Sequence, residues 1–151
     1  MNDIAVFVNS KIGTVRDNVQ LEINEMESWL NEILVQTKNI PKKERCQVCN
    51  SREMQYNLEQ HHIAGRKHDS RAVTVCRRCH AELSESQKTW DVRWMEVNQS
   101  QYVKDAFFLL GLHDVLVLRS KFTANDVCYA IAFNLRQKIS DLLQIRQGIC
   151  A

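Results

Sequence analysis

Three motifs decide the fold of this chain: Cys46-Gln47-Val48-Cys49, the pair His61-His62, and Cys76-Arg77-Arg78-Cys79-His80. Each Cys-x2-Cys pair can present two sulfur atoms to one tetrahedral ion, and two such pairs are typical of a four-thiolate zinc site. Cys46, Cys49, Cys76 and Cys79 are therefore predicted to bind a structural zinc ion. The 26 residues between the pairs must then form a folded insert. A complete sulfur shell leaves His61, His62 and His80 free for another role.

Composition and cysteine usage bound the class of protein. The 151 residues suffice for one compact domain, or for a small zinc module with helical additions. One proline and four glycines favour a helix-rich chain. The paired cysteines and the lack of an N-terminal apolar signal segment favour a reducing compartment, so we expect a cytoplasmic protein. Cys128 and Cys150 stand apart and are predicted to be small buried hydrophobic residues.

Charge is unevenly distributed along the chain. Residues 42–93 contain 11 Lys and Arg against 7 Asp and Glu, whereas the remainder contains 9 against 11. A basic centre with acidic flanks is compatible with a local phosphate-binding surface and equally with an ordinary solvated face. The charge alone does not choose between them.

The N-terminal segment, residues 1–41, is predicted to be helical. Apolar residues recur on one helical stripe over 17–37, and Pro41 lies just beyond its end. Residues 4–8 are open to interpretation as a short strand or a helix start, and Gly13 is expected to interrupt either one. The stripe has coiled-coil spacing, but two heptads are more typical of packing within one domain. A dimer arm is the alternative.

The central segment, residues 42–90, is predicted to be a strand, a loop, a strand and a helix. The strands are expected over 56–63 and 72–75, the loop over 64–70, and the helix over 77–88. Zinc would tie the start of this unit to its end. The fold class is therefore α+β, with a zinc-bound finger embedded between helical segments.

The C-terminal segment, residues 91–151, is predicted to form a helical hairpin that packs against helix 17–37. Its helices are expected over 103–118 and 127–142, with Thr123 or Asn125 as the cap of the second. The apolar run 106–118 is too short to cross a bilayer, so no membrane helix is expected. Trp90 and Trp94 are expected to cover the junction between finger and hairpin.

The motifs resemble the zinc-containing branch of the HNH nucleases over about residues 46–88. In that family Cys-x2-Cys, a His-His-Ile strand end and Cys-x2-Cys-His belong to a ββα-metal finger. The resemblance implies a metal-dependent endonuclease that hydrolyses phosphodiester bonds, in DNA more than in RNA. It also implies that His61 and His80 bind a catalytic Mg²⁺ or Mn²⁺ ion and that His62 is the general base. His68 and His113 receive no role.

Arg71 departs from the family pattern, because an asparagine usually stands five residues before the second cysteine pair. That asparagine braces the loop that holds the base, and an arginine side chain has no acceptor to replace it. Either Asp69 or Ser70 braces the loop instead, or the site is weakened. Arg71 is also one of five residues predicted to contact phosphate groups, namely Arg66, Lys67, Arg71, Arg77 and Arg78.

Two alternatives to a nuclease remain open. One is a zinc-stabilised nucleic-acid-binding module without catalysis, which the arginine at position 71 favours. The other is a structural protein in which the finger clamps a helical bundle. In each case the helical regions offer a surface for a protein partner or for a homodimer.

Overall fold

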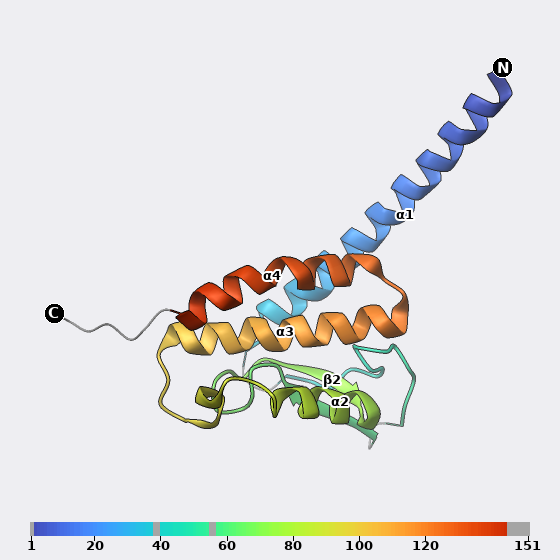
Figure 1. Cartoon of the computed structure of the whole chain (residues 1–151). Coiled ribbons are helices and arrows are strands. Elements are labelled where there is room, and N and C mark those ends of the chain that lie inside the picture. Colours follow the sequence, from blue (N-terminus) through green and yellow to red (C-terminus); the bar gives the residue numbers. More distant parts are fainter. Residues whose placement is uncertain (1, 38–39, 55–56, 145–151) are drawn as a thin grey trace.

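The computed structural model describes residues 2–37, 40–54 and 57–144, and in it a small sheet lies at one side of a group of helices (Figure 1). As predicted, the chain combines helices with a two-stranded antiparallel sheet. Cys150 lies outside the described residues. The elements in chain order are α1 (Asn2–Leu34), β1 (Leu58–His62), β2 (Ala72–Cys76), α2 (Arg77–Gln87), the 3-10 helix η2 (Val92–Met95), α3 (Gln101–Thr123) and α4 (Asp126–Gln144).

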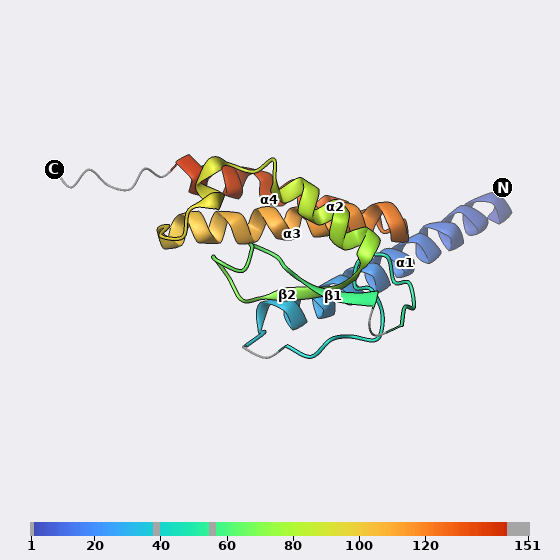
Figure 2. The ribbon, with the colours of Figure 1, turned by 90° about the horizontal axis from the view of Figure 1, so that it is seen from below.

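Helix α3 lies at the centre of the molecule. Figures 1 and 2 show α4 running back along one side of α3, while α2 and the hairpin lie on the other side. The reversal after α3 is made by Ala124, whose φ of 52° is left-handed. Asn125 then caps α4, because its Oδ1 accepts the Cys128 N–H at 3.2 Å. Of the two predicted caps, the structure therefore selects Asn125.

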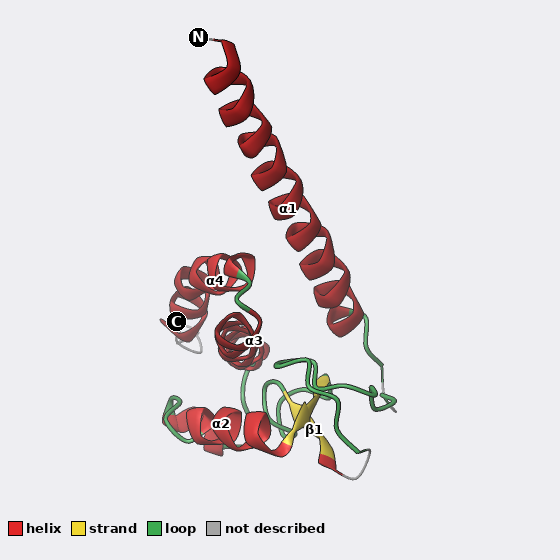
Figure 3. Cartoon of the chain, turned by 90° about the vertical axis from the view of Figure 1, so that its right-hand side faces the viewer, coloured by secondary structure: helices red, strands yellow, loops and turns green. Residues whose placement is uncertain are grey.

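Helix α1 is longer than predicted and runs without a break through Gly13. The expected interruption at Gly13 is wrong, as is the possible strand at residues 4–8. A glycine inside a helix costs about 1 kcal/mol relative to alanine, which the neighbouring helix-forming turns can absorb. The helix also ends at Leu34, before the expected residue 37. Only its C-terminal part packs on the body, through Met26, Trp29 and Ile33 (Figure 3).

The hairpin pairs Leu58 with Cys76 at its open end and His62 with Ala72 at its loop end. Its strands lie within two residues of the predicted ones. The free edge of β2 is capped by two glutamine side chains. The Gln36 side chain accepts the Ala72 N–H and donates to the Ala72 carbonyl. The Gln47 side chain accepts the Thr74 N–H, and the Gln47 backbone N–H donates to the Thr74 carbonyl. The edge therefore has no unpaired backbone groups at these positions, although within the described residues no further strand covers it.

The buried side chains of the three predicted segments form one continuous core. Trp90 and Trp94 contribute to it as predicted, with ring centroids 5.7 Å apart, and Trp90 stacks on Phe107 of α3 at 5.9 Å. The Trp94 indole N–H donates to the carbonyl of Ala64 in the hairpin loop at 2.9 Å. The two indoles therefore join the finger to the helical hairpin.

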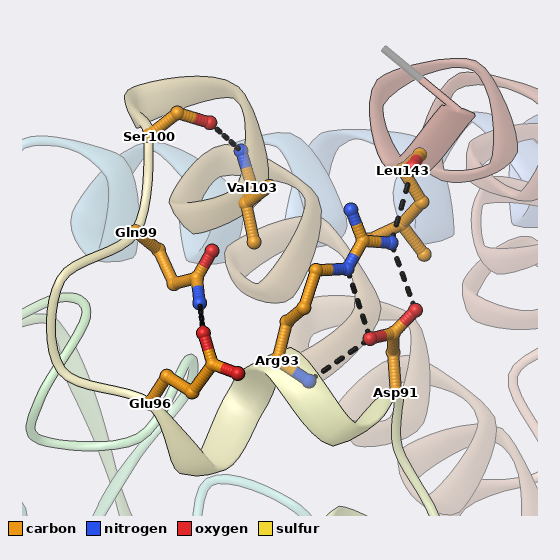
Figure 4. A network of polar contacts seen from close by, with 7 residues as sticks. All are labelled: Asp91, Arg93, Glu96, Gln99, Ser100, Val103 and Leu143. Atoms are coloured by element: carbon orange, nitrogen blue, oxygen red, sulfur yellow. Dashed lines mark hydrogen bonds and ion pairs between the residues drawn. The ribbon is translucent and has the colours of Figure 1, made fainter. Parts of the chain in front are cut away.

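The connection from α2 to α3 is ordered by polar contacts (Figure 4). Asp91 accepts the Arg93 backbone N–H at 3.0 Å and two guanidinium hydrogen bonds at 2.9 and 2.8 Å. These bonds lower the pKa of the Asp91 carboxyl to about 2. The same guanidinium donates to the Leu143 carbonyl in α4 at 3.1 Å, and Ser100 caps α3 by accepting the Val103 N–H. The connection is thereby fixed to both helices.

Helix α3 makes a close backbone approach to the end of β1 at Gly111. A Cβ atom there would overlap the carbonyl group of Ile63, the residue that follows β1. The same carbonyl accepts a hydrogen bond from the Gln87 side chain of α2 at 3.3 Å. Gly111 therefore sets the distance between α3 and the strand that carries His61 and His62.

Gly111→Ala is expected to lower the free energy of unfolding by about 1–3 kcal/mol, because an added methyl group must displace backbone. Urea denaturation measures this difference. Gly13→Ala is the matched control. Nothing lies within 4 Å of a Cβ at Gly13, so the same substitution should leave stability unchanged or raise it. Equal effects of the two substitutions would contradict the close approach at Gly111.

Candidate metal centres

Four cysteine side chains from three segments meet at the open end of the hairpin. Cys46 and Cys49 belong to a tight turn, Cys76 ends β2, and Cys79 lies in the first turn of α2. Their sulfur atoms all lie within 4.8 Å of one another. The turn is closed by the Asn50 N–H, which donates to the Cys46 carbonyl at 2.9 Å, with Asn50 in the left-handed region at φ 61°.

The geometry of this cluster suits a tetrahedral ion. Zinc–sulfur bonds of about 2.3 Å place neighbouring sulfur atoms about 3.8 Å apart. The Sγ atoms of Cys49 and Cys76 are separated by 3.8 Å. Ser51 Oγ lies 3.1 Å from Cys49 Sγ, and the Cys49 N–H donates to Cys46 Sγ at 3.4 Å. The four predicted cysteines are therefore placed to hold a metal ion such as zinc.

The thiols of the cluster influence one another's ionisation. The side chain of Cys79 hydrogen-bonds Cys46 and lowers the pKa of Cys46 to about 4. The same contact raises the pKa of Cys79, and burial raises the pKa of Cys76. One thiolate thus opposes the formation of the next. A bound cation reverses this effect because it favours every deprotonated sulfur that touches it.

A second cluster contains His61 of β1 and His80 of α2. Their rings meet edge to face, with centroids 5.3 Å apart and an interplanar angle of 75°. Burial, followed by the nearby His80 and His62, lowers the pKa of His61 to about 4, so its imidazole is neutral near pH 7. The ring of His80 is half-buried, and neither histidine belongs to the sulfur cluster. The structure thus brings together the two histidines to which the resemblance gives one shared ion.

Glu59 contacts this histidine pair, although it was not among the predicted site residues. Its Oε2 lies 2.6 Å from His80 Nδ1. A carboxylate in this place favours the tautomer in which Nδ1 carries the proton, and Nε2 then keeps its lone pair. Because side chains two apart in a strand share a face, Glu59 lies on the same face of β1 as His61. The two-residue period of a strand would therefore have been enough to place Glu59 beside His61 from the sequence.

His62 lies at the loop end of the hairpin in different surroundings from His61. Burial and the positive charge of Arg66 lower its pKa, while Asp69 opposes the shift. Its backbone carbonyl accepts the Gly65 N–H at 3.0 Å and the Gln87 side chain at 3.2 Å. Alternate residues of a strand point to opposite faces, which explains why the two neighbouring imidazoles do not share one environment.

The loop after His62 is closed by Asp69 and Arg71. Asp69 accepts the Arg71 backbone N–H at 2.8 Å and both arms of its guanidinium, at 2.9 and 2.7 Å. Burial raises the pKa of Asp69, but these hydrogen bonds outweigh it and lower the pKa overall. The Ile63 N–H completes the closure by donating to the Arg71 carbonyl at 3.1 Å. Of Asp69 and Ser70, the two residues expected to brace this loop, Asp69 therefore makes the bracing contacts.

The predicted phosphate-binding residues occupy both ends of the hairpin. Arg66 and Lys67 are exposed in the loop, and the Lys67 ammonium donates to the Met95 carbonyl at 3.1 Å. Arg77 and Arg78 are exposed on the first turn of α2, where Arg78 covers the Phe122 ring at 4.3 Å. Arg71 pairs with Asp69 and stacks on Phe108 at 3.6 Å, so its charge is already largely neutralised. The basic residues thus flank the histidines.

His68 and His113, which received no predicted role, have structural contacts. His68 is buried beside Phe107, and its Nε2 lies 2.8 Å from the Trp94 carbonyl. His113 hydrogen-bonds Asp114 at 3.0 Å. Asp114 also accepts hydrogen bonds from Ser86 and Trp90, which joins α2 to α3. The sequence carries no local signal for this contact, because its partners are 24 and 28 residues away.

Comparison with known proteins supplies no relative for this chain. It matches no protein-family model, no curated protein and no solved structure. Among the helices that the structure describes, none has both the length and the apolar character needed to cross a bilayer. A function is therefore inferred from the chemistry of the cysteine cluster and of the His61–His80 pair.

Proposed function

We propose that this protein is a metal-dependent, HNH-like endonuclease that hydrolyses phosphodiester bonds, with DNA as the preferred substrate. The main support is the meeting of His61 and His80 at 5.3 Å between ring centroids. One imidazole comes from a hairpin and the other from the following helix, beside a separate cluster of four sulfur atoms. This arrangement suits a structural ion and a second, exchangeable ion with different ligands.

The cysteine cluster would hold zinc in a purely structural role. Four sulfur ligands complete a tetrahedral shell, so no position is left for water or substrate. The cluster would fasten the 46–49 turn to the end of β2 and the start of α2. Thiolate ligands require reduced cysteines, and we therefore place the protein in a reducing compartment such as the cytoplasm.

His61 and His80 would hold the catalytic Mg²⁺ or Mn²⁺ ion. His61 is neutral near pH 7 and His80 has its Nδ1 engaged by Glu59, so each has a ring nitrogen suited to a cation. Two protein ligands leave most of the coordination shell to water and phosphate oxygens, as hard divalent cations prefer. When bound, such an ion supplies electrostatic stabilisation of the negative charge on the phosphoryl and leaving oxygens.

His62 would act as the general base. Its lowered pKa keeps the imidazole neutral near pH 7, with a lone pair able to accept a proton from water. The resulting hydroxide would attack the phosphorus atom, the P–O3′ bond would break, and the departing O3′ would take a proton from solvent water, which leaves a 5′-phosphate and a 3′-hydroxyl. Arg66, Lys67, Arg77 and Arg78 would bind backbone phosphates on either side, and Arg71 would act mainly through Asp69.

A nucleic-acid-binding module without catalysis is the second candidate. The observation that favours it is Arg71, which fills the usual asparagine position and has its guanidinium committed to Asp69. Such a module would keep the structural zinc and the flanking basic residues. It would bind DNA in the presence of Mg²⁺ or Mn²⁺ and leave every phosphodiester bond intact.

Incubation of the zinc-loaded protein with supercoiled plasmid DNA tests the proposal. The expected result is nicking in Mg²⁺ or Mn²⁺, no nicking in the absence of added divalent cation, and 5′-phosphate ends on the products. Binding without cleavage in a mobility-shift assay would replace the nuclease by the binding module. Neither binding nor cleavage would leave a structural protein in which the finger clamps the helices.

Glu59→Gln is expected to weaken Mn²⁺ binding at the histidine pair by about 10–100-fold, because loss of a carboxylate beside a ligating histidine has this effect. Titration calorimetry with zinc-loaded protein measures the affinity directly. Glu82→Gln is the matched control. Glu82 lies on α2, the helix that carries His80, but its carboxylate pairs with Lys121 at 3.9 Å and not with a histidine. Unchanged Mn²⁺ affinity in Glu59→Gln would remove Glu59 from the site.

A further inference from the structure

The N-terminal half of α1 extends away from the rest of the molecule as an arm (Figures 1 and 3). Apolar side chains follow this arm: Val8 is 47% exposed, Ile12 51%, Val15 61% and Val19 42%. An isolated helix of this length is marginally stable in water, and β-branched residues weaken it further. The arm therefore needs a surface that covers these side chains.

The exposed side chains continue a seam that already packs inside the molecule. Its members recur at alternating spacings of three and four residues: Ala5, Val8, Ile12, Val15, Val19, Glu22, Met26, Trp29 and Ile33. The last three are buried against the body, where Met26 Sδ lies 3.1 Å from Cys128 Sγ. This spacing is that of the a and d positions of a coiled coil. The arm thus presents the same helix-packing face to solvent.

We propose that this face binds α1 of a second copy of the chain, as an antiparallel two-helix coiled coil centred between Ile12 and Val15. The proposal concerns an interaction surface and is independent of the hydrolytic function. Three properties of the arm support this occupant and this orientation. They are the basic residues beside the seam, the acidic residue Glu22 within it, and the length of the arm.

A parallel pair is disfavoured by charge. In a parallel coiled coil each seam residue faces its own copy, so two Glu22 carboxylates would meet across the seam. Lys11 and Arg16 flank the seam as g and e positions of successive heptads, and a parallel pair places Lys11 beside Arg16 of the second copy. Both contacts bring like charges together, which destabilises the pair.

One antiparallel register removes these conflicts. When Ile12 faces Val15 of the second copy, Val8 faces Val19, and Glu22 faces the small Ala5 at the solvated end. In antiparallel pairs g positions lie beside g positions and e beside e, so Lys11 meets Asn18 and Arg16 meets Asn9. A shift of one heptad towards the N-terminus would place two Lys11 side chains together. A shift in the other direction would place two Arg16 side chains together and set Ile12 against Glu22.

The length of the arm matches this register. Residues 4–12 and 14–21 are exposed, Glu22 is half-buried, and Met26 is the first fully buried residue. Pairing residue 5 with residue 22 therefore uses the whole free arm, about 27 Å at 1.5 Å per residue, and ends where the body begins. The two bodies then lie at opposite ends of the paired helices and do not compete for space.

Sedimentation equilibrium of the full chain over a range of concentrations tests the pairing. The wild-type protein is expected to be a dimer. Val15→Glu should weaken the dimer at least ~100-fold, because it removes two buried valine contacts and places charges in the seam. Leu21→Glu is the matched control: Leu21 is 67% exposed against 61% for Val15, but it lies on the far side of the helix. It should leave the dimer intact.

Far-ultraviolet circular dichroism and the zinc content show whether each variant keeps a folded body. A wild-type monomer at every concentration, or equal effects of Val15→Glu and Leu21→Glu, would overturn the proposal.

Two charge variants test the orientation without disturbing the seam. Asn18→Glu should tighten an antiparallel dimer about three- to fivefold, because the introduced carboxylate of each copy then pairs with Lys11 of the other. Lys11→Glu should have little effect on an antiparallel dimer. A parallel dimer would show the reverse, since the carboxylate introduced by Lys11→Glu would then pair with Arg16 of the second copy. That reverse result would overturn the proposed register.

Discussion

Cys79→Ser is expected to lose the structural metal ion and to unfold the hairpin together with α2. The effect should exceed that of any single core substitution in this chain, because apparent binding free energies of structural zinc sites are about 10–16 kcal/mol. Those values were obtained for fingers with no other core, and here α3 and α4 retain their own contacts. We therefore expect partial unfolding, with the loss concentrated in residues 42–90.

The physical reason lies in the position of the sulfur cluster, which lies where the 46–49 turn, the end of β2 and the start of α2 meet. A two-stranded sheet is marginally stable by itself, and the turn that carries Cys46 and Cys49 reaches β2 mainly through Gln47 and Thr74. A metal ion held by the sulfur cluster would join this turn to Cys76 and Cys79 through four metal–sulfur bonds. Without them, buried thiols that oppose one another's ionisation would remain at the same place.

Metal content and thermal unfolding measure this prediction. The wild-type protein should contain one zinc ion, and a chelator should lower its melting temperature. Cys128→Ser is the matched control, because Cys128 is also a buried cysteine but lies on α4, outside the cluster. Cys128→Ser should keep the zinc ion, and its melting temperature should fall only by the amount expected for one altered core contact. A Cys79→Ser protein with wild-type zinc content and melting temperature would contradict the role of the cluster.

The finger was largely predictable from the sequence because its signals are local. Alternation places the strands within two residues of β1 and β2, and the second cysteine pair fixes the start of α2 at Arg77. The meeting of four cysteines follows from the preference of one ion for four sulfur ligands. Each of these inferences needs only residues that lie within one element or bind one ion.

Features that depend on contacts between distant segments were not predictable. The fit of Gly111 against Ile63 joins two separate segments, and a glycine inside an apolar helix gives no sign of what it touches. Asp114 likewise gains its partners only when α2 packs on α3. The beginning of α1 was missed for another reason. Apolar residues outside the seam, among them Ile4, Val6 and Phe7, together with the glycine at position 13, mask the three- and four-residue spacing of the seam, although the helix is continuous.

His62→Ala is expected to reduce plasmid nicking by about 10²–10⁴-fold, the usual contribution of a general base. The same variant should bind Mn²⁺ and DNA as the wild type does, because His62 is not one of the two proposed ion ligands. His80→Ala should lose nicking together with Mn²⁺ affinity. The difference in Mn²⁺ affinity between His62→Ala and His80→Ala distinguishes a general base from an ion ligand. His113→Ala is the control for removal of a histidine outside the pair. The His113 ring contacts Asp114 and Arg136, and because Asp114 also acts on His61 by raising its pKa, a change in nicking of no more than a few-fold is expected.

The pH profile of nicking provides an independent test of His62. A general base acts in its deprotonated form, so the rate should rise with pH through its pKa and then level off. Burial and Arg66 lower the pKa of His62 from its ordinary value of 6.5. The midpoint of the acid limb is therefore expected below pH 6.5. Arg66→Gln removes one of the two causes and should move that midpoint upward, towards the ordinary value, without changing Mn²⁺ affinity. A midpoint that stays fixed in Arg66→Gln, or nicking by His62→Ala at the wild-type rate, would assign the proton transfer to another group.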